Sequence, residues 1–170
     1  MLAMEGVFAF FLESSFLSPL VWGEKRFGPK THFAAAVALW IGSWLSGYFI
    51  IATNSFMQHP VGHALGADGA LRLADFSAFL FNPWALTTYA HNMIATVVTA
   101  SFAVAAVGAL YTLQGKHADA ALRFLRIGTI AGLCASVLVA FPTGDRQAKM
   151  VAKFQPVALA AMEGRFKSGP

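Results

Sequence analysis

Four long apolar blocks constrain the fold of this chain more than any other feature of its sequence. They are residues 1–22, 33–53, 89–113 and 120–141. A helix that crosses a bilayer needs roughly 17–25 mostly apolar residues, and each block has about that length. The second and third contain no Asp, Glu, Lys or Arg, and the fourth qualifies if Arg123 and Arg126 extend to the interface. The sequence therefore predicts an all-α, polytopic membrane protein whose four transmembrane helices form an up-down bundle over residues 1–142.

The composition favours a lipid environment and excludes several other classes of protein. The chain is 57% hydrophobic and 12% charged, whereas soluble domains are roughly 45–50% apolar and about 25% charged. The single cysteine, Cys134, excludes an intrachain disulfide and a cysteine-based metal site. The net charge of +4 is not accompanied by a basic patch with interleaved aromatic residues. We therefore expect the basic residues to face the headgroups of a lipid bilayer, and we expect no nucleic-acid partner.

Two short basic turns and one longer polar segment connect the blocks. They are residues 23–32 with the helix breakers Gly28 and Pro29, residues 113–123, and residues 54–88. Short loops carry most weight in the positive-inside rule, which places the two turns inside and both ends of the four-helix region outside. Beyond Pro142 the chain is polar, with apolar side chains at helical spacing, which predicts an interfacial amphipathic segment. Because the first block begins at residue 1 without a flanking anchor, we expect this chain to be part of a larger protein.

Two carboxylates interrupt the first apolar block. Glu5 and Glu13 are eight residues apart, so on a helix they lie roughly 12 Å apart along the axis and about 80° apart around it. Both can therefore face one protein interior, where intramembrane carboxylates often mark proton or ion paths. Glu5 has an alternative, because a residue near the terminus can simply reach the interface. On the second block, Ser46 within "GSWLSG" is explained by close helix packing, with a hydrogen-bonded proton path as the alternative.

His91 is the histidine that lies well inside a spanning block. A lone histidine near a helix end is commonly an interfacial or hydrogen-bonded residue. Neutral imidazole is also a common haem ligand, and a helix-borne histidine can hold an iron porphyrin between helices. Both interpretations stay open at this point. His59 and His63 have i,i+4 spacing, but the intervening Pro60 and Gly62 argue against a metal-binding helix.

Four stretches of sequence resemble one family, in order along nearly the whole chain. They are "EGVFAFFLESSF", "GSWLSGYFIIATNSFMQHPVG", "FNPWALTTYAHNMIATVVTA" and "GDRQAKMVAKFQPVALAAMEG". Together they resemble subunit I of the cytochrome bd-type quinol oxidases, over roughly the second to fifth of its helices. The resemblance implies a terminal oxidase of the bacterial inner (cytoplasmic) membrane. Quinol would be oxidised at the outer face, and electrons would pass through a low-spin haem b to dioxygen at a high-spin pair of haem b and haem d.

The same resemblance assigns roles to individual residues. The histidine of the family's "AH" position, an axial ligand of the low-spin haem b, is His91 here. The glutamates of "EG…FLES", on a proton route to and beside the high-spin haems, are Glu5 and Glu13. The serine of "LSG" and the asparagine of "ATN" border that route, which gives Ser46 and Asn54. The expected partners are the remaining helices of subunit I and a second oxidase subunit.

Residues 143–170 would then form the start of an extracytoplasmic quinol-binding loop. The glutamate of "AAMEG" is Glu163, which the resemblance assigns to quinol binding. The family's lysine in "QPxKLAAME" is Ala158 here, and a loop position that is commonly glycine is Ala148. The family's other haem ligands, including the methionine opposite His91, have no counterparts, so the chain alone cannot complete a haem site.

Three functional hypotheses follow. The chain is a piece of a genuine oxidase subunit I, a truncated paralogue without catalysis, or a small proton-coupled transporter in which Glu13 is the transport carboxylate. The transporter hypothesis leaves the joint occurrence of His91, "MQHP" and "GD…QP…AAME" unexplained, so it ranks last.

Overall fold

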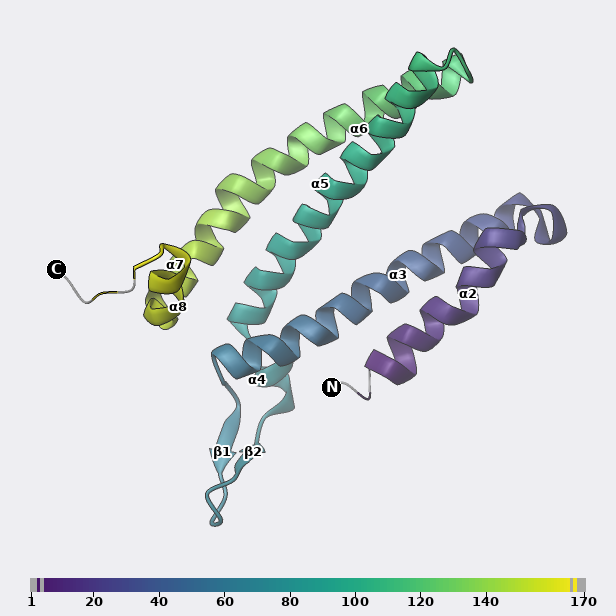
Figure 1. The fold of residues 1–170 in the computed structure, drawn as a ribbon. Helices are drawn as coiled ribbons and strands as arrows, with labels where there is room; N and C mark the ends of the chain where they lie inside the picture. The colour runs from purple at the N-terminus through teal and green to yellow at the C-terminus, as the bar shows by residue number, and fades with distance from the viewer. Residues whose placement is uncertain (1–2, 4, 166, 168–170) are drawn as a thin grey trace. The chain divides into compact units, whose positions relative to one another are not determined.

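The computed structural model describes residue 3, residues 5–165 and residue 167. Two compact units, residues 1–89 and 90–170, divide the chain, and their boundary falls inside helix α5. In chain order (Figure 1) the elements are η1 (Glu5–Phe10), α2 (Phe11–Trp22), α3 (Glu24–Gln58), β1 (His63–Leu65), β2 (Leu71–Leu73), α4 (Phe76–Leu80), α5 (Pro83–Leu113), α6 (Ala118–Leu138), η2 (Val139–Gly144), α7 (Asp145–Phe154) and α8 (Pro156–Met162). The elements η1 and η2 are π-helical turns.

Three helical stretches are long and apolar enough to cross a membrane. They are Glu24–Gln58, Phe76–Leu113 and Ala118–Phe154, and they contain the predicted blocks 33–53, 89–113 and 120–141. The first predicted block, residues 1–22, is divided between the turn η1 and the 12-residue helix α2, and residues 1, 2 and 4 lie outside the described residues. Four spans and an up-down bundle therefore stay a prediction.

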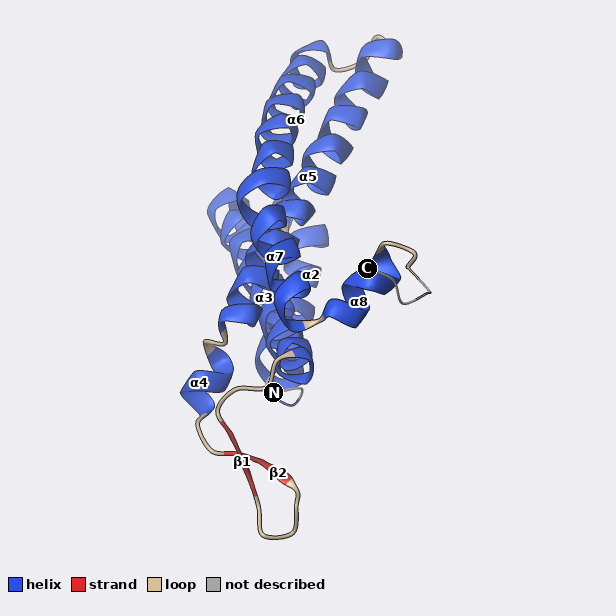
Figure 2. Cartoon of the chain, turned by 90° about the vertical axis from the view of Figure 1, so that its left-hand side faces the viewer, coloured by secondary structure: helices blue, strands red, loops and turns tan. Residues whose placement is uncertain are grey.

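The expectation of an all-α fold needs one correction. Strands β1 and β2 form an antiparallel hairpin, with His63 opposite Leu73, inside residues 54–88, the segment predicted as a longer polar connection (Figure 2). Asp68 stabilises the tip by accepting bonds from the Ala70 N–H at 3.2 Å and the Arg72 guanidinium at 3.0 Å. These two bonds hold the pKa of Asp68 below its ordinary value. The pair is exposed to solvent, so it contributes little to stability.

The predicted breakers Gly28 and Pro29 produce a kink rather than the end of a helix. Gly28 has φ 77° and ψ 166°, whereas the rest of Glu24–Gln58 is helical. Proline disfavours the α conformation in the residue before it, and glycine reaches positive φ without strain. The region 23–32 is therefore mostly helical, which corrects its prediction as a simple turn. The His32 Nε2 donates to the Leu20 carbonyl at 2.7 Å, which ties α3 to the neighbouring α2 (Figure 1).

Helix α5 begins earlier than predicted because "NPW" is a helix start. Asn82 is fully buried, and its Oδ1 accepts from the Trp84 N–H at 2.9 Å, as an N-cap residue does. Pro83 occupies the first helical position, where the missing N–H has no cost. The Asn82 Nδ2 also donates to the His59 carbonyl at 2.9 Å, so one amide joins the end of α3 to the start of α5.

Replacing Asn82 by alanine should lower the stability of the first unit by about 1–3 kcal/mol. The change removes a helix cap and a bond to a backbone carbonyl, both at a fully buried side chain. The loss is measurable as a lower unfolding temperature of the detergent-solubilised protein. Ser77→Ala, on the exposed face of α4, should change stability by no more than about 0.5 kcal/mol. Equal effects of the two variants would contradict this account.

An aromatic cluster joins α3 to the following elements of the first unit. The Tyr48 hydroxyl donates to the Leu80 carbonyl, and the Tyr89 hydroxyl donates to the Trp44 carbonyl at 3.0 Å. The rings of Tyr48 and Tyr89 meet edge to face, with centroids 5.0 Å apart. Both hydroxyl groups thus donate hydrogen bonds to backbone oxygens, while the two rings pack against each other.

In the second unit, small residues bring α5 and α6 together. A Cβ added at Gly128 would lie 2.5 Å from the Ser101 carbonyl oxygen, and one at Gly108 would lie 2.5 Å from the Leu125 nitrogen. No side chain fits at either place unless the helices move apart. Such glycines let two helices pack closely. Close packing matters in a bilayer, because the hydrophobic effect does not drive helices together there. After α6 the chain continues through η2 into the two short helices α7 and α8, in the region predicted to be amphipathic.

Candidate functional site

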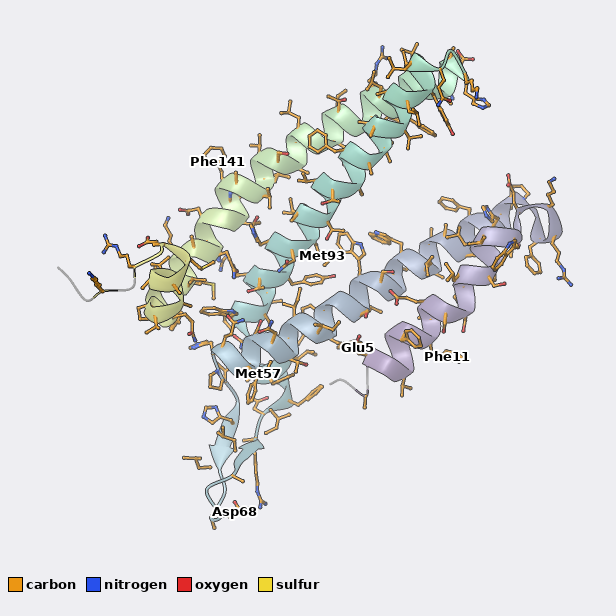
Figure 3. All side chains as sticks on the ribbon, viewed as in Figure 1. Glu5, Phe11, Met57, Asp68, Met93 and Phe141 are labelled. Carbon is orange, nitrogen blue, oxygen red and sulfur yellow. The ribbon has the colours of Figure 1, made fainter. Side chains whose placement is uncertain are left out.

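Glu5 lies on η1 and contacts helix α3. The Ser46 Oγ donates to the Glu5 Oε1 at 3.3 Å, although the two residues are 41 positions apart in the sequence. Figure 3 labels Glu5 where η1 lies beside α3. Both side chains are half-buried. The two residues that the sequence selected for different reasons are therefore hydrogen-bonded neighbours.

Glu13 also faces α3, at Gly42, which lies one helical turn before Ser46. A Cβ added at Gly42 would lie 3.2 Å from the Glu13 Cγ, so the glutamate side chain packs directly over the glycine. Gly42 and Ser46 are four residues apart and share one face of α3. Both carboxylates therefore meet the same helix face, as the eight-residue spacing of Glu5 and Glu13 allows.

The structure does not bring Asn54 into this group. Asn54 lies on α3 about two turns beyond Ser46, or roughly 12 Å along the axis. Its side chain is exposed, and its Oδ1 accepts from the Gln58 Nε2 at 2.7 Å. In the part of the chain that the structure describes, Asn54 thus bonds along its own helix and not with either glutamate.

His91 lies on α5 and contacts the turn η2. Its Nδ1 is 3.3 Å from the Thr143 Oγ1, across 52 residues of sequence. The Thr143 hydroxyl is also within bonding distance of two backbone oxygens, Leu138 O at 3.1 Å and Val139 O at 3.4 Å. A Cβ added at Gly144 would lie 3.7 Å from the His91 Cε1, so the imidazole sits against this turn. The ring is half-buried.

Proline explains why η2 has this shape. In an α-helix the Leu138 carbonyl would accept from the N–H of residue 142, which is Pro142 and has none. A π-helical turn, with i→i+5 bonding, forms at this point, and π-turns are frequent at functional sites. The Thr143 hydroxyl also donates a hydrogen bond to the Leu138 carbonyl oxygen. The local sequence "PTG" therefore determines where the partner of His91 lies.

The loop residues lie on and after α7 and α8. Glu163 follows α8, is exposed, and has its Oε2 3.7 Å from the Arg165 Nε. Ala158 lies within α8, so positions 158 and 163 are about 140° apart around the helix. On α7, the Lys149 Nζ bonds Asp145 at 2.7 Å, whereas the Lys153 Nζ lies 5.0 Å from the centre of the Phe154 ring.

Comparison with known proteins places this geometry in a family. Residues 1–170 match the family described as cytochrome bd terminal oxidase subunit I. The chain belongs to that family. It is 36% identical over 170 residues to the cytochrome bd-II ubiquinol oxidase subunit 1 of Escherichia coli (strain K12), covering 99% of this chain and 33% of the relative. It is 33% identical over 169 residues to the cytochrome bd ubiquinol oxidase subunit 1 of Bacillus subtilis (strain 168), covering 98% of this chain and 35% of the relative.

A solved structure agrees with these relatives. The bd oxidase of Geobacillus thermodenitrificans has a chain that matches with a TM-score of 0.81 and 33% sequence identity. The match covers 98% of this chain and 38% of that chain. The present chain thus spans about a third of the length of the curated relatives it matches. Membership in the subunit I family, with three helices of spanning length, makes the chain part of a multi-pass membrane protein.

Membership in the subunit I family implies a haem cofactor. Among the described residues, one histidine side chain suits the binding of haem iron. His91 offers an imidazole whose Nδ1 already has a hydrogen-bond partner, as metal-bound histidines usually have. Across residues 3, 5–165 and 167, no three His, Cys, Asp or Glu side chains converge on a metal site. Within these residues, the His91 imidazole is thus a side chain that could hold a haem iron.

Two residues of this subunit I chain were missed from the sequence. Thr143 was not selected, because a threonine 52 residues from His91 carries no local signal of contact. Gly42 belongs to the stretch "GSWLSG", which predicts close helix packing, and its neighbour is the side chain of Glu13. Each of the two sites includes a π-turn, because Glu5 lies on η1 and Thr143 lies on η2.

Proposed function

We propose that this chain is part of a terminal quinol oxidase subunit. The whole enzyme would transfer electrons from quinol through a low-spin haem b to dioxygen at a high-spin pair of haem b and haem d. The match of all 170 residues to the cytochrome bd subunit I family carries this proposal. The relatives named above are a ubiquinol oxidase subunit 1 in Escherichia coli and another in Bacillus subtilis. A further Bacillus subtilis relative is a putative menaquinol oxidase subunit, so the kind of quinol stays open.

His91 is the proposed axial ligand of the low-spin haem b. When bound, that haem supplies one-electron transfer from the quinol. The residues of this chain hold and orient one side of it, because His91 lies on the long helix α5 and contacts η2. The second ligand and the high-spin pair belong to the remaining helices of subunit I in this proposal.

Glu5, Glu13 and Ser46 are proposed to carry protons toward the site of oxygen reduction. The Glu5–Ser46 hydrogen bond and the packing of Glu13 over Gly42 support this role, because they place two carboxylates along one face of α3. A protonated carboxyl can donate and an ionised one can accept, so each can pass a proton to a neighbour. Asn54 would border this route at the far end of α3, through an amide that does not itself titrate.

Residues 143–170 are proposed as the start of an extracytoplasmic quinol-binding loop, with Glu163 as a quinol contact. The exposure of Glu163 and the short helices α7 and α8 support an accessible surface. Residues 1–142 would then hold four spans, with residues 1–22 as the first. The proposed location is the bacterial inner membrane, in a complex with the remaining subunit I helices and a second oxidase subunit.

Redox difference spectra test this proposal. The chain is expressed with the remaining helices of a subunit I and with a second subunit, and membranes are reduced with quinol. Low-spin and high-spin haem bands, together with quinol-driven oxygen uptake, are the expected result. A proton-coupled transporter would show neither, and a non-catalytic paralogue would show no oxygen uptake.

Ala158→Lys should raise quinol turnover about tenfold without altering the haem spectra. An ammonium can hydrogen-bond a quinone oxygen and stabilise negative charge as the hydroxyl proton leaves, which alanine cannot do. A tenfold gain corresponds to roughly 1.4 kcal/mol of transition-state stabilisation. Glu163 cannot replace this group, because it lies about 140° around the helix from position 158. Quinol oxidation kinetics in membranes measure the effect.

The matched control is Ala160→Lys, which adds the same charge to α8 about 160° away from position 158. It should leave turnover unchanged. No gain from Ala158→Lys, together with an inactive Lys153→Ala, would show that Lys153 supplies the charge; Lys149 is the weaker candidate, because it already bonds Asp145. No gain with both lysines dispensable would contradict this account of the loop.

A further inference from the structure

We propose that Thr143 is a positioning residue for His91: its hydroxyl accepts the Nδ1 proton of the imidazole and thereby leaves Nε2 as the nitrogen that binds haem iron. This inference rests on the proposed role of His91 as a haem ligand. It adds Thr143, which lies outside the four stretches that resemble the family. It also assigns which nitrogen of the His91 ring binds the iron.

The direction of the hydrogen bonds follows from the donors that are available. A threonine hydroxyl has one hydrogen, and carbonyl oxygens only accept. The Thr143 hydroxyl lies 3.1 Å from the Leu138 carbonyl oxygen and 3.4 Å from that of Val139, so its hydrogen is directed to the backbone. Its oxygen is then left as an acceptor toward the His91 ring. The Nδ1 at 3.3 Å must therefore carry the proton.

The consequence for the ring is a fixed tautomer. A neutral imidazole protonated at Nδ1 has its lone pair at Nε2, and the nitrogen that binds a metal is set by the bond that the other nitrogen makes. Among the described residues 90–165 and 167, Thr143 is the hydrogen-bond partner found for this ring. Nε2 then carries the lone pair that can bind haem iron.

The backbone around Thr143 shapes this arrangement. Pro142 removes one N–H from the helix, the chain forms the π-turn η2, and the threonine hydroxyl donates into that turn. Gly144 adds a steric requirement, because a Cβ there would lie 2.5 Å from the Val139 carbonyl oxygen. A side chain at position 144 would thus push against the turn that holds Thr143. The imidazole therefore contacts a turn whose local shape depends on Pro142, Thr143 and Gly144.

The bond should also tune the iron. A hydrogen bond from Nδ1 raises the basicity of a ligating imidazole. A more basic ligand stabilises ferric iron more than ferrous iron, so loss of the bond should favour the ferrous form. A hydrogen bond to the side chain that binds the iron is one of the ways in which a protein sets the potential of a haem.

The test compares Thr143→Val with Thr143→Ser in the complete assembled oxidase that contains this chain. Valine keeps the shape and removes the hydroxyl, and serine keeps the hydroxyl. A redox titration followed at the low-spin haem band is the measurement. In Thr143→Val the ferrous-to-ferric ratio at a fixed potential should rise about threefold, which is about 30 mV for a one-electron couple. Thr143→Ser should match the wild type.

Thr99→Val is the matched control, because Thr99 also bonds a carbonyl of its own helix, Ala95 O at 3.2 Å, and is exposed on α5. It should leave the potential unchanged. If Thr143→Val does not assemble, Thr143→Cys takes its place with the same expected direction, because sulfur is a weak acceptor. An unshifted potential in the tested variant, or an equal shift in serine and Thr99→Val, would overturn the proposal.

One further variant separates this inference from the proposed function. His91→Ala should remove the low-spin signal altogether. If that signal persists, the ligand assignment itself is wrong. If it disappears while the potential of Thr143→Val equals that of the wild type, the ligand assignment stands and only the role of Thr143 is lost.

Discussion

His91→Ala should abolish the low-spin haem b signal and leave the high-spin bands in place. Alanine has no nitrogen to offer the iron, and the other histidine in the described part of the second unit, His117, lies exposed at the opposite end of α5, in the turn before α6. A haem that loses one of two axial protein ligands loses its low-spin character and often its binding. Quinol-driven oxygen uptake should stop as well, because the electrons enter through this haem in the proposed mechanism.

The measurement is a reduced-minus-oxidised spectrum of membranes that contain the complete oxidase. His63→Ala is a suitable control, because His63 is an exposed histidine on strand β1. That control should retain the low-spin band at full intensity. A low-spin band of normal height in His91→Ala would show that another residue holds the haem, and with it the electron path through α5 would have to be abandoned.

Much of the fold could be predicted from the sequence, and the errors have local causes. Apolar blocks of about 20 residues identify the three long helical stretches, because few other folds accommodate so much apolar surface. Their ends were less accurate, since a capping asparagine and a proline at the first helical position extend α5 back to Pro83. The hairpin was missed because strands of three residues, each exposed throughout, leave no alternating pattern to detect.

The candidate site could be predicted only where a residue is unusual in its own segment. Carboxylates in an apolar block and a histidine in an uncharged helix are such cases, so Glu5, Glu13 and His91 were selected. Their neighbours were not all accessible in this way. Thr143 and Gly42 are ordinary residues in helical segments, and their contacts with His91 and Glu13 arise from tertiary packing across tens of residues. A single sequence gives no information on such pairs.

Glu13→Gln should slow oxygen reduction by about a hundredfold while leaving the haem spectra unchanged. Glutamine retains the size and hydrogen-bonding shape of glutamate, but it cannot take up and release a proton in this pH range. Removing one positioned acid–base group typically costs roughly 100-fold to 10,000-fold in rate. The side chain also packs over Gly42, so a nearly isosteric replacement preserves the contact between α2 and α3. A fall in rate with normal spectra would therefore report proton transfer and not damage to the fold.

Two controls separate the chemistry at Glu13 from its packing. Glu24→Gln makes the same chemical change at an exposed position at the start of α3, and Ser18→Ala removes a polar group at an exposed position of α2. Both should keep nearly full oxygen uptake. If Glu13→Gln falls no further than these controls, Glu13 serves packing alone. A proton route would then have to rely on Glu5 and Ser46. Their hydrogen bond places the Glu5 carboxylate against the face of α3 that carries the Ser46 hydroxyl.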